Sequence, residues 1–233
     1  MRTNIYIDGF NLYYLRLRAQ PHFKWLNLEE LAREAIDPKH QIQSVKYYTA
    51  RVSSRLDPGA PARQQVYLSA LATVPSIEVH YGNFLYSEKW AYLVRPPQAK
   101  PSNYQWPANL PDLVWVAKTE EKGSDVNLAS HLVRDAFTGA FDAAIVISND
   151  TDLVEPIRIA RYEAGKTVGL LSPYSPNAPI NPRTGRRPTA SRSLTNVATF
   201  TRYIHNSHLR RAQFPDPVVA PNGQVIVRPQ SWI

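Results

Sequence analysis

Short apolar runs alternate with amphipathic stretches along most of the chain, and this alternation limits the fold more than any other feature. The expected strands are residues 4–8, 44–51, 77–81, 143–148 and 167–171, and the expected helices are 11–18, 28–36, 60–73, 124–137, 151–164 and 195–208. Strands separated by helices form βαβ units and therefore a parallel sheet. The run at 143–148 is almost entirely apolar, as expected for a central strand covered on both faces. The sequence thus predicts an α/β fold with a central parallel sheet flanked by helices.

Two segments depart from this alternation. Residues 83–118 hold five prolines and three tryptophans, so we interpret them as an insertion with the character of a loose hairpin. Its aromatic rings either stack on nucleobases or seal the insertion onto the core. Residues 176–233 form an arginine-rich extension, which we expect to pack on the same domain. The organisation is therefore one α/β domain at 1–175, interrupted by the insertion and followed by the extension.

The formal net charge of +8 is concentrated in the extension, where eight arginines face a single acid, Asp216. Arginine binds phosphate through two parallel hydrogen bonds and stacks on bases, so a nucleic acid is the partner this charge favours. The alternative is a solvated basic tail that serves solubility. The chain has no cysteine, no long apolar span and no apolar leader, which agrees with a cytoplasmic protein and excludes thiolate chemistry.

Four aspartates are expected at one edge of the sheet. Asp8 ends the first strand, Asp150 and Asp152 follow the central strand, and Asp125 begins a helix. Ligands of open parallel sheets bind beyond the carboxyl ends of the strands. Each aspartate taken singly could be a cap or a turn residue. Together they would repel one another without a cation, and Mg²⁺ or Mn²⁺ prefers such oxygen ligands.

Neighbouring polar residues are candidates for supporting roles. Asn11 lies on the first turn after Asp8 and either supports the acidic site or caps the helix. Ser148 and Thr151 flank Asp150 and either hydrogen-bond a carboxylate or contact RNA. The other predicted RNA contacts are Lys122, Arg183, Arg186, Arg187 and Arg192. For Lys122, as for Ser148 and Thr151, a plain surface or capping role is an equal alternative.

Three segments resemble the signature motifs of the NYN domain family, a branch of the PIN-like nucleases: residues 6–12 (YIDGFNL), 122–129 (KGSDVNLA) and 147–153 (ISNDTDL). The resemblance covers about residues 3–173. It implies a Rossmann-like sheet and Mg²⁺- or Mn²⁺-dependent RNA cleavage. By this resemblance Asp8, Asp125, Asp150 and Asp152 form the acidic site, and Asn11 supports it.

One position departs from the family pattern. Many members carry an aspartate in the helix where this chain has His131, which either supports the metal ligands or is merely packed, and we favour packed. Glu121 and Asp142 are lesser candidates for a substitute ligand.

The leading hypothesis is a metal-dependent endoribonuclease that hydrolyses RNA phosphodiester bonds at the aspartate cluster. The alternative is an RNA-binding or adaptor module with the same fold and little or no catalysis. A flap-type DNA nuclease is less well supported, because no helical arch is evident. A phosphomonoesterase would need a DxD motif after the first strand, which Asp8-Gly9-Phe10 lacks. The sequence leaves a homo-oligomer and a protein partner open.

Overall fold

The computed structural model describes residues 1–55, 57–93, 111–175, 177–181 and 185–233. Within these residues the main sheet has seven strands in the order β4-β3-β2-β1-β5-β6-β7. Their bounds are β1 Arg2–Asp8, β2 Gln41–Ala50, β3 Ile77–Tyr92, β4 Leu113–Lys122, β5 Ala143–Ile147, β6 Thr167–Ser172 and β7 Phe200–Tyr203. Neighbouring strands pair in parallel except β3 and β4, which are antiparallel. The expected parallel α/β sheet is confirmed.

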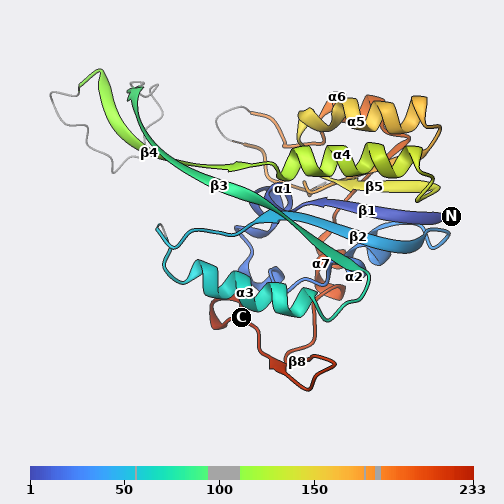
Figure 1. Cartoon of the computed structure of the whole chain (residues 1–233), viewed down its shortest axis with the longest axis horizontal. Helices are drawn as coiled ribbons and strands as arrows, with labels where there is room; N and C mark the ends of the chain where they lie inside the picture. The colour runs from blue at the N-terminus through green and yellow to red at the C-terminus, as the bar shows by residue number, and fades with distance from the viewer. Residues whose placement is uncertain (56, 94–110, 176, 182–184) are drawn as a thin grey trace.

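Helices cover the sheet on both faces (Figure 1). Their bounds are α1 Gly9–Leu12, α2 Leu28–Ala35, α3 Ala60–Leu71, α4 Ser124–Phe137, α5 Val154–Arg158, α6 Arg192–Val197 and α7 Asn206–Arg211. Helices α4, α5 and α6 lie on one face, and α2, α3 and α7 lie on the other. Two further segments extend this pattern: α1 continues as a π-helical turn at Tyr13–Leu17, and α5 follows a 3-10 turn at Thr151–Leu153.

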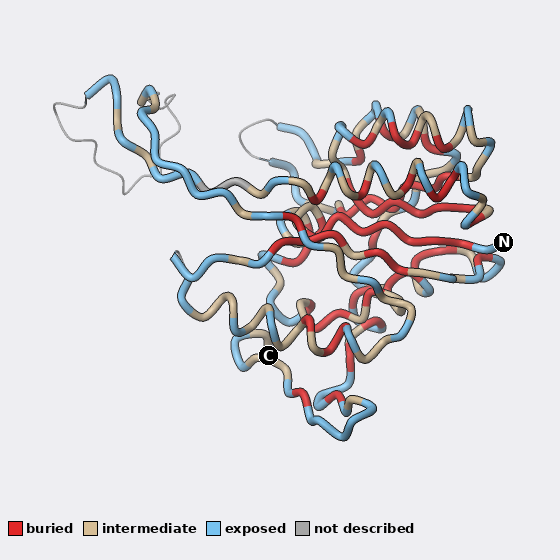
Figure 2. The backbone as a smooth tube through the Cα atoms, in the orientation of Figure 1, coloured by how far each residue is buried: buried red, intermediate tan, exposed pale blue. Residues whose placement is uncertain are grey.

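Alternation along β1 divides the core into two layers. Ile5 and Ile7 face α2, α3 and α7, whereas Tyr6 faces α4 and α5. Strand β5 is buried along its whole length, because helices cover it on both sides. Figure 2 shows this concentration of buried backbone in the central strands. The uninterrupted apolar run of β5 therefore reports a central position, as predicted.

The described residues of the insertion belong to two long antiparallel strands that project from the body (Figure 1). Strand β3 does not end near residue 81 but continues to Tyr92, and its ladder with β4 runs from Asn83↔Lys122 to Tyr92↔Leu113. Trp90 and Trp115 contact each other at 5.4 Å between ring centroids, and both are exposed. Trp90 and Trp115 therefore do not seal the insertion onto the core, whereas Phe84, at the base of the hairpin, contacts Phe10 of α1 at 5.5 Å between ring centroids. Trp106 lies outside the described residues.

The predicted helix at 195–208 is also wrong. That stretch contains the end of α6, the strand β7 and the start of α7. The ring of Phe200 packs on Gly169 of the neighbouring strand β6. A Cβ at Gly169 would lie only 2.4 Å from that ring, so the close contact, which fixes β7 against β6, requires glycine there. Beyond α7, a two-stranded sheet of β8 (Val218–Val219) and β9 (Val225–Ile226) and a terminal turn (Gln230–Trp232) follow.

Candidate active site at the carboxyl edge of the sheet

Asp8 is the buried centre of the candidate site, with 3% of its surface exposed. Its Oδ1 accepts a hydrogen bond from the backbone N–H of Asn11 at 2.9 Å, and its Oδ2 accepts one from Ser148 Oγ at 2.9 Å. Asp8 thereby caps α1, whereas the alternative role expected for it was that of a turn residue. The pKa of Asp8 is raised to about 6, chiefly by burial; the charges of Asp125 and Asp150 add to this rise, and the hydrogen bonds from Asn11 and Ser148 oppose it. Capping and membership of an acidic cluster thus coexist in one side chain.

Gly9 follows Asp8 because no side chain fits there. A Cβ at this position would lie 2.6 Å from the carbonyl oxygen of Tyr48 and 2.7 Å from the ring of Tyr47. The strand β2 therefore approaches the start of α1 closely, and this approach fixes the turn that carries Asp8.

The loop after β5 carries a second acidic group. Ser148 is fully buried and accepts a hydrogen bond from the backbone N–H of Asp150 at 3.0 Å, besides donating to Asp8. Asp150 Oδ1 accepts the N–H of Asp152 at 3.0 Å and caps the following 3-10 turn. Of the two roles predicted for Ser148, its contacts are those of the carboxylate partner. Thr151 is exposed on the turn that Asp150 caps.

Two asparagines hold this loop in place. Asn11 Oδ1 accepts the backbone N–H of Asn149 at 2.8 Å, which ties α1 to the end of β5. Asn149 Oδ1 in turn accepts the N–H of Ser191 at 2.7 Å, which brings the start of α6 to the same edge. Sequence reasoning missed Asn149, although its place between Ser148 and Asp150 in the motif was a signal. Asn11 thus holds the loop after β5 against α1.

Asp125 belongs to a third segment, and its charge acts on Asp8. Gly123, at φ 98°, turns the chain from β4 into α4, and Asp125 lies in the first turn of that helix. Burial raises the pKa of Asp125, and the charges of Asp150 and then Glu121 raise it further. Glu121 Oε1 also accepts the backbone N–H of Ser124 at 2.9 Å. The acidic groups expected at one edge therefore influence one another there.

Hard carboxylate oxygens are the donors that Mg²⁺ and Mn²⁺ prefer, so the chemistry of these groups fits such a cation. Within the described ranges, no set of three acidic or histidine side chains is arranged as a ready ligand shell. A magnesium ion usually needs only one or two protein carboxylates and keeps several waters. Of the two substitute ligands considered, Asp142 forms an ion pair with Arg2 at the end of β1 opposite to Asp8. Glu121 is the one whose charge acts on Asp125, so it is nearer to the acidic residues.

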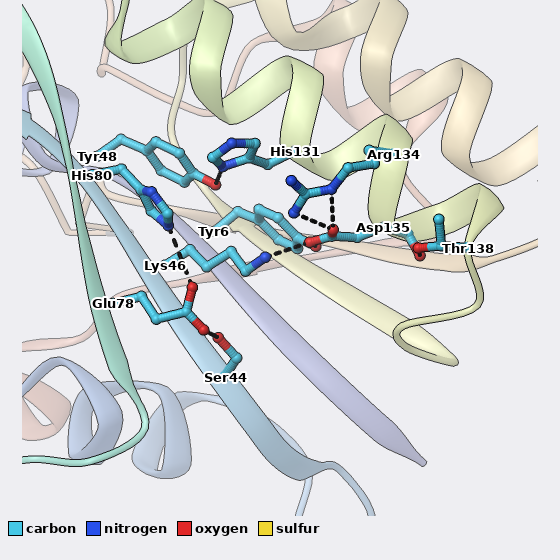
Figure 3. Close-up of polar contacts among 10 residues, drawn as sticks. All are labelled: Tyr6, Ser44, Lys46, Tyr48, Glu78, His80, His131, Arg134, Asp135 and Thr138. Carbon is cyan, nitrogen blue, oxygen red and sulfur yellow. Dashed lines mark hydrogen bonds and ion pairs between the residues drawn. The ribbon is translucent and has the colours of Figure 1, made fainter.

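Beneath α4 lies a separate buried polar network (Figure 3). Lys46 Nζ contacts Asp135 Oδ2 at 2.6 Å, and Tyr6 donates its hydroxyl to the same oxygen at 2.8 Å. Burial alone would raise the pKa of Asp135, but hydrogen bonds from Lys46, Tyr6 and Arg134 outweigh it and lower that pKa. The network ties the far half of α4 to β1 and β2, and so holds the helix that carries Asp125.

His131 belongs to this packed region. Its Nδ1 lies 3.0 Å from the hydroxyl of Tyr48, and its ring is 4.7 Å from that of His80. Burial lowers the pKa of His131, which favours the neutral ring. The interpretation of His131 as packed is therefore confirmed.

A model of the NYN domain matches residues 2–204, which is most of the chain. The chain belongs to the NYN domain family. The match extends past residue 175 and includes β7, in agreement with its place in the main sheet. Family membership implies a nuclease-like fold, of a kind that generally acts on RNA and depends on divalent metal.

Two known proteins are similar to this NYN domain. One is 6-hydroxy-3-succinoylpyridine 3-monooxygenase HspA of Pseudomonas putida (strain DSM 28022 / S16), which is 30% identical over 251 residues that cover 100% of this chain and 75% of HspA. The other is a crystal structure of a protein of unknown function from Vibrio parahaemolyticus RIMD 2210633. It is 18% identical, covers 88% of this chain and 93% of that chain, and has a TM-score of 0.48.

The residues predicted to bind RNA differ in their placement in the NYN domain. Arg192 is exposed at the start of α6, one residue after the Ser191 that Asn149 binds. Lys122 is exposed at the end of β4, two residues before α4. Arg186 and Arg187 are exposed, and Arg187 donates to the carbonyl of Ala178 at 2.6 Å. Arg183 lies outside the described residues.

Across the described ranges, no helix combines the length and the apolar character needed to cross a bilayer.

Proposed function

We propose that this NYN domain is a metal-dependent endoribonuclease that hydrolyses RNA phosphodiester bonds at Asp8, Asp125, Asp150 and Asp152. One observation carries the proposal: Asp8 is a buried carboxylate whose pKa is raised to about 6, chiefly by burial and further by the charges of Asp125 and Asp150 from two other segments. Such an arrangement destabilises the empty protein and favours a cation. A binding module would gain nothing from repelling phosphate at this edge.

The cation in this proposal is Mg²⁺ or Mn²⁺, held by Asp8 and Asp150 with Asp125 and Asp152 nearby. When bound, it would activate a water and offset negative charge on the phosphate. Asp8 is oriented for this role by its hydrogen bonds to Asn11 and Ser148. Preorganised ligands of this kind bind more tightly, because little ordering remains to be done.

RNA is the proposed partner, and its proposed contacts are basic side chains and a hydroxyl. Arg192 and Lys122 are each close in sequence to a residue that positions the site. The proposal adds Arg183, Arg186 and Arg187 as further RNA contacts, and Thr151 is the exposed hydroxyl beside Asp150. Contacts of this kind to phosphate release counterions, so binding should weaken steeply with salt.

A second candidate is hydroxylation of an aromatic ring, which the name of HspA suggests and the full coverage of this chain by the match favours. It would require dioxygen and a reductant. The two candidates separate readily, because hydroxylation consumes reductant in the absence of RNA.

The decisive experiment is cleavage of a mixed pool of structured and single-stranded RNA in Mn²⁺, Mg²⁺ or EDTA. Wild type should cleave only with metal. Asp150→Asn should abolish cleavage, although the asparagine can still cap the 3-10 turn at Thr151–Leu153. Asp142→Asn is the matched control, since its carboxylate lies at the other end of β1. Full activity of Asp150→Asn would refute the assignment. Tight RNA binding without cleavage by wild type would favour the alternative of an RNA-binding or adaptor module.

A further inference from the structure

A cavity of about 510 Å³ lies directly beside the acidic edge, on the sheet face that carries α2 and α3. The turn at Gly9, the end of β2, the start of α3 and the C-terminal turn line it. Its volume is in the range of small-ligand sites in proteins. Neither the acidic cluster nor the network of Figure 3 accounts for this cavity.

Aromatic rings form much of its wall. Phe10 lies 6.4 Å from Tyr14 in a stacked arrangement and 5.5 Å from Phe84 in an edge-to-face one. Tyr67 lies 6.5 Å from Tyr47 and 6.0 Å from Trp232, both edge to face. Flat rings at these spacings present faces and edges on which a planar ligand can stack.

Cationic side chains complete the lining. Arg18, Lys24, Arg55 and Arg63 all border the cavity, against a single carboxylate, Asp57, which pairs with Arg63. Arg18 lies over the ring of Tyr14 at 5.7 Å, and Lys24 lies over Tyr13 at 5.2 Å. Among the described residues, neither Arg18 nor Lys24 has an acidic partner within 4.0 Å. Positive charge here is therefore available to a ligand.

The cavity and the acidic edge share one boundary. The ring of Tyr47 lies against Gly9, where a Cβ would be only 2.7 Å from it, and Asp8 precedes that glycine. The charge of Asp8 also acts on the Tyr47 hydroxyl, whose pKa burial raises to about 12. An anionic group attached to a ring in the cavity would therefore lie within the electrostatic reach of the site.

We propose that this cavity binds an aromatic ring that carries an anionic group, and that the ligand in the reaction is one unstacked nucleotide of the RNA substrate. The choice of a nucleotide rests on the proposed ribonuclease function, whereas the ring-and-anion chemistry rests on the lining alone. The base stacks among the aromatic rings, and the phosphate lies against Arg18 or Lys24. Single-stranded RNA is commonly held by this combination of stacking and positive charge.

The test is isothermal titration calorimetry in EDTA, which needs neither metal nor cleavage. Uridine 5′-monophosphate should bind saturably, and uridine should bind about tenfold more weakly or worse, because it lacks the anion. Nicotinate serves as an aromatic anion that is not a nucleotide. The double variant Arg18→Gln/Lys24→Gln should weaken the monophosphate by about tenfold or more. Arg210→Gln, at an exposed arginine of α7, is the matched control and should leave affinity unchanged.

Each result decides a part of the inference. Binding of neither anion, or binding that the double variant does not affect, overturns it. Binding of nicotinate alone overturns the nucleotide as ligand and supports a free aromatic acid in the same cavity. Thermal unfolding of the double variant checks that it folds. A shift of the Trp232 indole resonance, assigned with Trp232→Phe, places the ligand in the cavity. If wild type cleaves RNA yet binds no mononucleotide, the cavity proposal fails and the ribonuclease proposal stands.

Discussion

Asp8→Asn should stabilise the metal-free protein at neutral pH. The folded state raises the pKa of Asp8 from 3.8 to about 6. Each pKa unit corresponds to about 1.36 kcal/mol, so the ionised carboxylate costs the folded state about 3 kcal/mol. Asparagine still accepts the N–H of Asn11 as a cap, but it weakens the bond with Ser148 by about 1–2 kcal/mol. The net gain in unfolding free energy should be about 1–2 kcal/mol.

The gain has a defined pH window. Because the folded state holds the proton more tightly, wild type is free of this penalty below the ordinary pKa of 3.8 and loses stability as the pH rises through about 6. The difference between the variant and wild type should therefore grow between these values and stay constant above them. Asp142→Asn should behave in the opposite sense, since the hydrogen bond from Arg2 lowers the pKa of Asp142 and its loss matters most at neutral pH.

Urea unfolding in EDTA at several pH values between about 4 and 7.5 measures these differences directly. Mn²⁺ should then raise the stability of wild type by about 2.7 kcal/mol at a hundred times its dissociation constant, and that of Asp8→Asn by much less. A variant that is less stable than wild type at neutral pH, or a difference that does not depend on pH, would refute the burial argument for Asp8.

Three further outcomes are expected. Lys46→Met should destabilise the fold by about 3 kcal/mol in chemical denaturation, because it removes the buried one of the two cations that pair with Asp135, and adding Asp135→Asn should recover part of that loss. Gly9→Ala should cost about 1–3 kcal/mol, since its Cβ would collide with the backbone and a ring of β2, and an unchanged melting temperature would contradict that contact. Arg186→Ala with Arg187→Ala should weaken RNA binding and flatten its dependence on salt, whereas unchanged affinity and slope would reduce the extension to a role in solubility.

The position of the acids could be predicted because it follows from local patterns. An apolar run that ends in an acid places that acid at a strand end, and parallel strands share one edge. Asp8 and Asp150 therefore required no knowledge of packing. Asp8 and Asp150 also cap the turns that follow them, and a cap depends on the same local pattern. Sequence alone therefore could not distinguish a helix-capping aspartate from one that belongs to the candidate site.

Features that depend on long-range contact could not be predicted. The apolar spacing at 195–208 resembles a helix, but β6 offers an unpaired edge, and Phe200 fits over Gly169 to form β7. Trp232 lines a cavity beside Gly9, more than two hundred residues earlier in the chain. Lys46 is a charged residue in the buried half of β2, between Val45 and Tyr47, but nothing local identifies Asp135 as its partner.

The hairpin of β3 and β4 is a part of the molecule whose length can be changed by design. Its ladder begins at the pair Asn83↔Lys122, and a single glycine, Gly123, separates it from α4. Antiparallel pairing means that residues removed in matched pairs from the outer ladder leave the register of the inner pairs unchanged. The arm can therefore be shortened, or fused to another protein, without a shift in the helix that carries Asp125.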